Sequence, residues 1–338
     1  MIAIYPDTII YIFCPANFAT GGPEALHQLA AALKRLYAGR VFMVYFSQKE
    51  ENPIHENYVN YQVPYTSSVE NNAQHVILVP ETYLEPIFYP KYSKVRKIVW
   101  WLSVTNYYTI LHEIEDYVSK KKLYGIKSSL FPNKYKPVPT FAALKKKNVF
   151  HIAHSFFSQE HLKNLNISVA AKISDYMNNA FFDLIKSDTE KEDIVVYNPK
   201  KNGEYLHNVM ALASDINFVP LVDMTPEEVA SWMNKSKLYI DFGYHPGQER
   251  MPREAILTNC CVITGSQGSA RYDEDVPLPA GYKFDEISAE PADVVKQIRL
   301  CLTNYDTEIL KFKNYQKVLH KEQETFENAV ANTFIQQK

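Results

Sequence analysis

Charged and hydrogen-bonding side chains are concentrated in one short stretch of the sequence, DFGYHPGQERMPREAILTNCCVITG. Between its apolar ends it carries His245, Gln248, Glu249, Arg250, Arg253 and Glu254. Pro252 suits the first position of a helix, where free backbone N–H groups attract an anion or a carboxylate. We therefore expect a helix start that follows a strand and holds an anion, with Arg250 and Arg253 adding positive charge and Glu254 accepting hydroxyl groups of a sugar. The alternative is a helix start with surface salt bridges.

A second polar stretch, YNPKKNGEYL, has the same form. An apolar run ends at Asn198, two lysines follow, and Gly203 opens a helical pattern. Lys200 and Lys201 are then placed to pair with a phosphate, although lysines after a strand are often only solvated. The GxxxxGK[ST] pattern of a P-loop is absent, which argues against a nucleoside triphosphatase.

Two loops of small residues let backbone N–H groups approach a ligand closely. Gly265 and Ser266 lie in TGSQGSAR, and Gly21 and Gly22 lie in NFATGGPE. The second loop has no GxGxxG pattern, and no acidic residue closes the next apolar run, so a nicotinamide site is not expected. Plain turn chemistry is the alternative for the first loop. Gly21 and Gly22 would admit a donor phosphate or an acceptor.

Glu81, in VPETY, directly follows an apolar run. A carboxylate at that place can act as a general base on an acceptor hydroxyl, or it is an ordinary helix-start residue. The sequence DED at 273–275 formally matches a metal–nucleotide motif, but it lies in a loop just before Pro277. We expect no metal site, because no other His, Cys, Asp and Glu residues have ligand spacing.

Residues 120–147 contain nine lysines and no acidic residue, with aromatic residues between them. Such a stretch is a solvated loop or a docking surface for an anionic membrane or a lipid pyrophosphate. The net charge of −2 does not favour a nucleic-acid partner.

Short apolar runs alternate with helical periodicity twice along the chain, which predicts two α/β units with parallel sheets. The runs are TIIYIFCPA (8–16), RVFMVYF (40–46), HVILVP (75–80), KIVWWLSV (97–104), VFHIAHS (149–155), DIVVYNP (193–199), INFVPLV (216–222), KLYIDFG (237–243) and CCVITG (260–265). Thr225 and Glu228 have the spacing of a helix capping box. Parallel sheets bind ligands beyond the carboxyl ends of their strands, so the polar stretches above belong to binding sites.

The length of 338 residues also suits two domains. We expect an acceptor domain at 1–167, a linker at 168–192, a donor domain at 193–310 and a C-terminal helix at 311–338 that returns to the first domain. Cys260 and Cys261 lie in an apolar run and are expected to be reduced and buried. No signal peptide or membrane-length apolar run is evident, which indicates a cytoplasmic protein.

Several stretches together resemble GT-B glycosyltransferases of bacterial capsule and O-antigen clusters. EAILTNCCVITG resembles their second-domain helix start and strand, with Asn259 and Cys260 in place of a usual Gly-x-Pro. Similar landmarks are WWLSV-N-Y, H-x-x-x-S-F, S-DY-N and YNPKK-G at 100–107, 151–156, 174–178 and 197–203.

The resemblance implies a GT-B fold of class α/β, with two Rossmann-like parallel-sheet domains that face a central crevice. It also implies transfer of a sugar from a nucleotide-sugar donor to an oligosaccharide or lipid-linked acceptor, without a cofactor or metal, by an enzyme peripheral to the membrane. Glu254 falls where family 4-like members bind ribose hydroxyls, whereas Pro246 and Gly247 stand where they carry an earlier Glu. Donor-binding residues would be Asn198, Lys200, Lys201, His245, Arg250, Arg253, Glu254, Gly265 and Ser266. A nucleotide-sugar epimerase and a non-catalytic glycan- or nucleotide-binding module are the alternatives.

Overall fold

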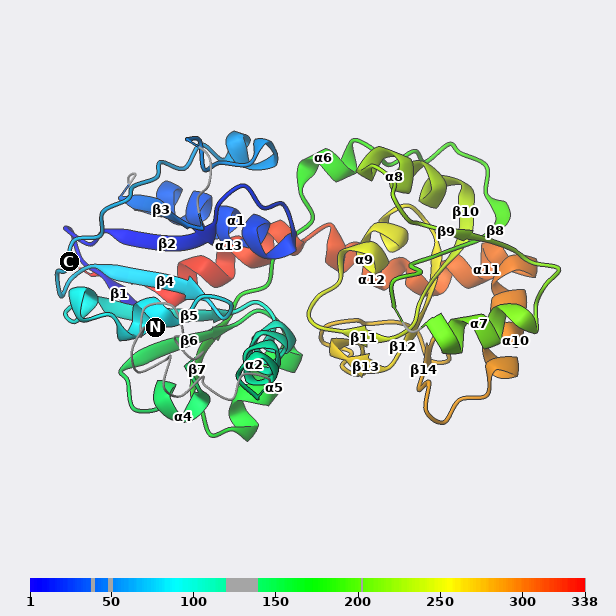
Figure 1. Ribbon diagram of the computed structural model, residues 1–338. Helices are drawn as coiled ribbons and strands as arrows, with labels where there is room; N and C mark the ends of the chain where they lie inside the picture. The colour runs from blue at the N-terminus through cyan, green and yellow to red at the C-terminus, as the bar shows by residue number, and fades with distance from the viewer. Residues whose placement is uncertain (38–39, 48–50, 120–138, 202, 338) are drawn as a thin grey trace. The chain divides into compact units, whose positions relative to one another are not determined.

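The computed structural model describes residues 1–37, 40–47, 51–119, 139–201 and 203–337, with only the backbone for 112–119. The chain divides into two compact units. Unit 1 comprises Met1–Ser174 and Phe326–Lys338, and unit 2 comprises Asp175–Thr325. Each unit is built around its own parallel sheet (Figure 1).

Unit 1 contains a six-stranded sheet in the order β3-β2-β4-β5-β6-β7, in which every neighbouring pair is parallel. Its strands are β2 (Ile10–Pro15), β3 (Val41–Phe46), β4 (Val76–Pro80), β5 (Arg96–Trp101), β6 (Val149–Ala153) and β7 (Val169–Lys172). Its helices include α1 (Gly21–Leu36), α2 (Val104–Ser119), α4 (Phe141–Leu144) and α5 (Phe156–Asn164), with short 3₁₀ turns η1 (Glu56–Tyr61), η2 (Glu85–Phe88) and η3 (Pro90–Tyr92). Helix α1 packs on β2 and β3, whereas α5 packs on β6 and β7. Continuous apolar runs form these strands because helices cover both faces of the sheet.

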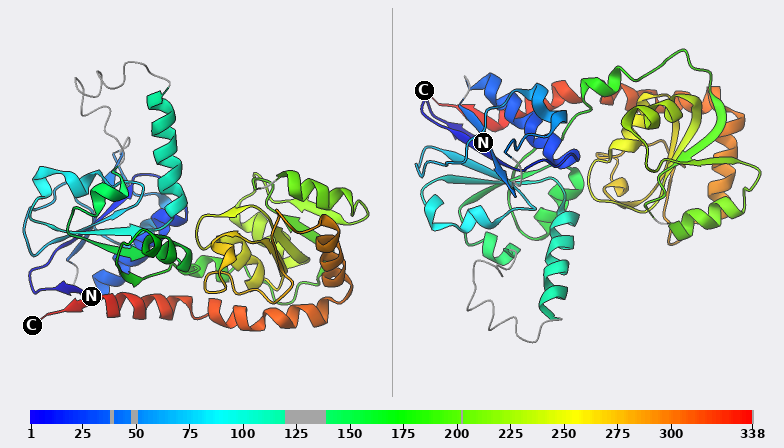
Figure 2. Two further views of the ribbon diagram at one scale, coloured as in Figure 1. Left: turned by 90° about the horizontal axis from the view of Figure 1, so that it is seen from below. Right: turned by 45° about the horizontal axis from the view of Figure 1, so that its top comes forward.

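The last described residues complete unit 1. Helix α13 (Glu322–Thr333) leads into β15 (Phe334–Gln336), which pairs in parallel with β1 (Ile2–Ile4). The two strands lie side by side at the edge of unit 1 (Figure 2). Phe326, Val330 and Phe334 are buried there. Residues from Phe326 onward belong to unit 1, whereas residues 311–325 of the expected returning segment belong to unit 2.

Unit 2 contains a five-stranded parallel sheet in the order β14-β12-β10-β8-β9. Its strands are β8 (Glu192–Tyr197), β9 (Asn217–Pro220), β10 (Ser236–Asp241), β12 (Cys261–Gly265) and β14 (Lys283–Phe284), and a separate small pair joins β11 (Tyr244–His245) to β13 (Gln267–Gly268). Its helices and turns are α6 (Asn179–Phe182), α7 (Gly203–Ala211), α8 (Pro226–Lys235), α9 (Arg250–Leu257), η4 (Ser269–Arg271), α10 (Pro291–Thr303), α11 (Tyr305–Glu308), η5 (Ile309–Phe312) and α12 (Lys313–Leu319). Helices α7 and α10 cover one face of the sheet, and α8 and α9 cover the other (Figure 1).

Local sequence signals are visible in these elements. The capping box of α8 forms as expected, since Thr225 Oγ1 accepts from the Glu228 N–H at 3.2 Å and the Glu228 carboxylate accepts from the Thr225 N–H at 2.8 Å. Cys14, Cys260, Cys261 and Cys301 are all reduced and buried. The sheet of unit 2 starts at Glu192, and the unit itself starts at Asp175, because the segment from Asp175 through α6 packs within it.

Candidate functional site

The residues that sequence analysis singles out all follow, or end, parallel strands at their carboxyl ends. Gly21 and Gly22 come after β2, Glu81 after β4, Asn198, Lys200 and Lys201 after β8, His245, Arg250, Arg253 and Glu254 after β10, and Gly265 and Ser266 at the end of β12. In open parallel sheets this edge is the usual ligand-binding edge. The largest group of these residues belongs to unit 2.

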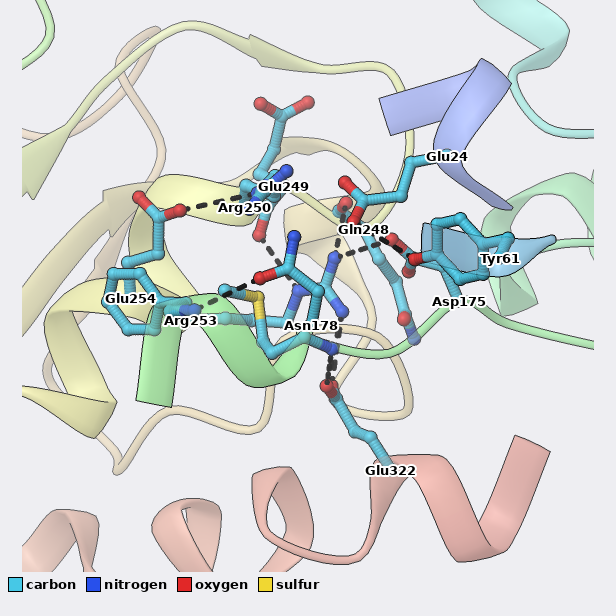
Figure 3. Close-up of polar contacts among 12 residues, drawn as sticks. Glu24, Tyr61, Asp175, Asn178, Gln248, Glu249, Arg250, Arg253, Glu254 and Glu322 are labelled. Carbon is cyan, nitrogen blue, oxygen red and sulfur yellow. Dashed lines mark hydrogen bonds and ion pairs between the residues drawn. The ribbon is translucent and has the colours of Figure 1, made fainter. Parts of the chain in front are cut away.

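The start of α9 carries a charged pair. Arg250 Nε lies 3.3 Å from Glu254 Oε1, one helical turn away (Figure 3). The Arg250 side chain is 37% exposed and that of Glu254 is 12% exposed. Arginine at this place combines with the positive end of the helix dipole, so the start of α9 can receive an anion while Glu254 offers acceptor oxygens.

The loop after β8 meets this helix start through Lys201. Its ammonium lies 2.9 Å from Glu249 Oε2, at the N-cap of α9, and 3.3 Å from Asp241 Oδ2, at the end of β10. The Asp241 carboxylate is fully buried and also accepts from the Tyr239 hydroxyl at 3.0 Å. Two features that the sequence suggests separately are therefore in contact.

Electrostatics in this cluster favour a fixed lysine charge. Burial opposes the charge of Lys201, but Asp241 and Glu249 more than offset it, so the pKa of Lys201 is raised. Burial raises the pKa of Asp241, against the opposing effect of Lys201. Among the described residues Asp241 Oδ1 has no hydrogen-bond partner. Lys201 is thus held as a cation between two carboxylates, the fully buried Asp241 and the 22% exposed Glu249.

Neighbouring residues shape the loop around Lys201. Asn198 Oδ1 accepts from the Lys200 N–H at 3.1 Å, which closes a tight turn and leaves the Lys200 side chain exposed. His245 is fully buried, its Nε2 lies 3.3 Å from the Asp241 carbonyl oxygen, and burial lowers its pKa to about 4. His245 is therefore neutral near pH 7 and supports the loop instead of adding charge to it.

Arg253 has a different task from the anion contact that sequence analysis expects. Its guanidinium is 2% exposed and lies between Asp175 Oδ2 at 3.0 Å and both Glu322 oxygens at 3.3 Å (Figure 3). Burial disfavours its charge, but Asp175 and Glu322 raise the pKa of Arg253 further above its usual value. Arg253 anchors α9 inside unit 2, and we leave it out of the ligand site.

The loop after β12 is closed by a carboxylate from further along the chain. Glu286 accepts from the Gly243 N–H, and its carboxylate lies against Gly265 so closely that a Cβ at that position would clash with it. A side chain at Gly265 would therefore displace the Glu286 carboxylate from its present place, whereas Ser266 next to it is half-buried. A carboxylate near backbone N–H groups adds acceptor capacity to this edge of the sheet.

In unit 1, Gly21 and Gly22 are the first residues of α1. A Cβ at Gly21 would meet nothing within 4 Å, and one at Gly22 would meet Leu102 Cδ1 at an ordinary 3.5 Å. Packing within the described chain does not demand glycine at either position. Small residues at a helix start leave room for a ligand, so the phosphate or acceptor contact stays a prediction.

Glu81 is buried at 2% exposure and accepts from the Leu102 N–H at 2.9 Å, just before α2. Burial raises its pKa to about 8, against the opposing effect of its backbone hydrogen bonds. The geometry gives this carboxylate a partner in its own unit. Its role as a base on an acceptor stays a prediction.

The described residues bear on the metal and membrane expectations in three ways. In the described part of the chain no group of three or more His, Cys, Asp and Glu side chains is arranged to hold a metal ion. Asp273 of the DED sequence pairs with Lys283 at 2.6 Å. Within the same residues, none of the helices has the length and hydropathy of a membrane span. Residues 120–138 of the lysine-rich stretch lie outside the described residues.

Sequence reasoning missed three acceptor groups of the site: Asp241, Glu249 and Glu286. Asp241 and Glu249 lie inside the charged stretch, and the strand-end position of Asp241 was a usable signal. Glu286 reaches Gly243 and Gly265 from 43 and 21 positions along the chain, respectively, and no local pattern announces such a contact.

No protein-family model matches the chain, and no curated protein sequence matches it. Solved structures do match its fold. Alr3699/HepE of Anabaena, in complex with UDP and glucose, is 11% identical with a TM-score of 0.64, over 96% of this chain and 98% of that one. Sucrose-phosphate synthase (tll1590) of Thermosynechococcus elongatus is 12% identical with a TM-score of 0.60, over 95% and 96%.

A variant of S. aureus TarM in complex with fondaparinux, α-GlcNAc-glycerol and UDP is 13% identical with a TM-score of 0.51, over 78% of this chain and 56% of that one. These structures are GT-B glycosyltransferases. At such low identity the similarity shows the fold alone, and this chain has the GT-B fold that sequence analysis expects.

Proposed function

We propose that this chain is a glycosyltransferase that moves a sugar from a nucleoside-diphosphate sugar to a saccharide acceptor. The observation that carries the proposal is the contact of Lys201 with Glu249, which joins the lysine loop after β8 to the start of α9. It brings Lys201 and Arg250, each paired with a carboxylate, to the carboxyl edge of the unit 2 sheet. The bound UDP in two structures of the same fold supports a uridine nucleotide as the first candidate.

In the proposed reaction an acceptor hydroxyl attacks the anomeric carbon of the sugar. The bond from that carbon to the diphosphate breaks, and the diphosphate leaves with the electron pair. Lys200, Lys201 and Arg250 stabilise the negative charge that grows on the diphosphate. Such electrostatic stabilisation is usually the largest single contribution to catalysis. The hydroxyl proton passes to a base, for which Glu81 is the residue predicted from sequence; with its pKa raised to about 8 by burial, it accepts a proton only in the fraction that is ionised, which grows at higher pH.

Donor recognition would depend on Glu254. Its carboxylate is held by Arg250 at 3.3 Å and is positioned to accept ribose hydroxyls. Lys201 would exchange part of its contact with Glu249 for the diphosphate. Lys200, Lys201, Arg250 and the start of α9 would contact the diphosphate, and we propose that no metal or other cofactor takes part.

The resemblance in sequence suggests a more specific acceptor. Capsule and O-antigen enzymes build bacterial surface polysaccharides, so we propose an oligosaccharide or lipid-linked acceptor, a hexosyl donor and work at the inner face of the cytoplasmic membrane. The lysines of 120–147 would supply the membrane contact.

The test is thermal stabilisation by UDP, GDP, CDP, CMP and TDP, in EDTA and again with magnesium. A nucleotide at 100 times its Kd stabilises the protein by about 2.7 kcal/mol. We expect one nucleoside diphosphate to act in EDTA, and Glu254→Gln to weaken that effect while Glu227→Gln, an exposed carboxylate in α8, does not.

Turnover then separates the functions. Sugar transfer to an acceptor supports the proposal, whereas interconversion of the donor alone indicates an epimerase and binding without turnover indicates a binding module. Stabilisation only with magnesium would contradict a metal-independent site.

A further inference from the structure

A second charged site lies in unit 1, at the other edge of its sheet. A cavity of about 480 Å³ is lined by residues 87–90, 93–97 and 146–148. These residues come from η2, η3, the amino end of β5 and the segment before β6. Lys97 pairs with Val149 at the start of these two strands, whereas Glu81 and Leu102 follow strand carboxyl ends. The cavity is therefore separate from the glycosyl-transfer site proposed above.

All charged residues that line this cavity are basic. Its lining includes Lys94, Arg96, Lys97, Lys146 and Lys147 and contains no acidic residue. None of the four lysines forms an ion pair with a carboxylate of the described residues. Lys94, Lys146 and Lys147 are exposed, so a ligand from solvent can reach them. Like charges gathered without a counter-charge repel each other, and a bound anion would relieve that repulsion.

The neighbouring positive charges affect Lys97 and Lys147. Burial, and then repulsion from Lys147, lower the pKa of Lys97. Lys147 itself lies over the Phe88 ring, 5.5 Å from its centroid, which restricts where its ammonium can go.

Arg96 is a fixed member of the lining. Its Nη1 donates to the Ala3 carbonyl and its Nη2 to the Gln74 carbonyl, and its guanidinium lies over the Tyr5 ring. These contacts hold Arg96 to neighbouring segments of unit 1, so the four lysines are the cations that remain for a ligand.

We propose that this cavity binds a ligand with at least two phosphate groups. Five cations around a small volume match a ligand that concentrates several negative charges, and each phosphate monoester carries up to about two. Four of the five are lysines, which bind phosphate as point charges, whereas paired planar carboxylates are typically bound by arginine forks. The volume is within the usual range of about 300–1,000 Å³ for small-molecule sites.

The same chemistry has two sources, a soluble polyphosphate and the headgroup of a lipid. Tripolyphosphate serves as the probe for the first, measured by calorimetry on the full chain. Vesicles of phosphatidylcholine with and without cardiolipin, whose headgroup has two phosphates, serve for the second, measured by co-sedimentation. Binding in either assay supports the site and identifies its source, and no binding in both overturns it.

Position is tested by matched variants of equal charge. Lys146→Gln with Lys147→Gln should weaken binding by about tenfold or more, since each lysine near such an anion contributes about 1 kcal/mol. Lys172→Gln with Lys186→Gln removes two exposed lysines outside the cavity and should have little effect. Equal weakening by both pairs would show diffuse surface charge and overturn the proposal.

Labelling of lysines gives an independent readout that separates this cavity from the lysine loop of unit 2. Tripolyphosphate should protect Lys94, Lys97 and Lys147 from an amine-reactive reagent, as read by mass spectrometry, while Lys145 stays reactive. Protection of Lys200 and Lys201 alone would place the anion at the donor site and overturn the inference. The proposal does not depend on glycosyl transfer, because neither assay uses a sugar donor.

Discussion

Asp241 and Lys201 hold each other in the polar cluster of unit 2. The carboxylate is fully buried, and the lysine is its cationic partner at 3.3 Å in the described structure. Removing one member of a buried pair leaves an uncompensated charge, which is more costly than the pair itself is stabilising.

Lys201→Met should therefore lower the free energy of unfolding by about 3 kcal/mol. Adding Asp241→Asn should recover most of the loss, because the buried carboxylate is gone. Urea unfolding of the two variants and the parent checks this. A double variant as unstable as Lys201→Met alone would show that the lysine acts through Glu249 or through packing.

Glu81 gives a pH-dependent prediction. Its pKa in the folded chain is about 8, above the ordinary 4.5 that applies when unfolded. Between these two values the unfolded chain binds fewer protons, so stability falls as pH rises through that window, by at most about 1.4 kcal/mol per pH unit. Glu81→Gln has no such proton, and its amide oxygen can still accept from the Leu102 N–H.

The stability of Glu81→Gln relative to the parent should thus rise between about pH 5 and about pH 8. Urea unfolding at both pH values measures it. A difference that is the same at both would contradict the raised pKa.

At the scale of elements, α9 depends on one arginine. The Arg253 guanidinium joins this helix to Asp175 and Glu322, and those two residues lie near the two ends of unit 2. The helix that presents Arg250 and Glu254 is thereby fixed to the segments where the chain enters and leaves the unit.

Arg253→Met should lower the free energy of unfolding by about 3–5 kcal/mol, because it leaves two carboxylates without their buried cation. Hydrogen exchange in α9 should become faster. Arg299→Met breaks an exposed pair with Asp215 and should cost little. Similar losses in both variants would argue against the anchoring role.

Local elements were largely predictable, and distant contacts were not. The runs 40–46, 149–155 and 260–265 form β3, β6 and β12, because apolar runs between turn signals encode buried parallel strands. Arg253, in contrast, meets Asp175 and Glu322 from 78 and 69 positions away. The periodicity of a sequence indicates only the helix or strand that a residue belongs to and not its distant partners. Arg253, at a helix start, is therefore predicted to contact a ligand.

The same limit explains the missed edge strands. β1 and β15 have three residues each, too few for a pattern, and each exists because it pairs with the other.

At the scale of the whole molecule, residues from the far end of the chain complete unit 1. Phe334 in β15 is 1% exposed, next to a strand that begins at Ile2. Phe334→Ala should cost about 3–5 kcal/mol by leaving a cavity, and amide exchange in β1 should accelerate while β10 stays protected. Phe18→Ala, at a side chain that is 55% exposed, is the control and should have little effect. Equal exchange in β1 for both variants would contradict this view of the edge.

The pairing of β1 with β15 also sets an order of events during synthesis. Domains usually fold as they emerge, with the N-terminal one first. Here β1 is made before unit 2, but its partner strand is translated only after all of Asp175–Thr325. Unit 2 is therefore synthesised in full before unit 1 has its last strand. Until then the nascent first unit has an unpaired strand edge, and such edges can pair with other chains and aggregate.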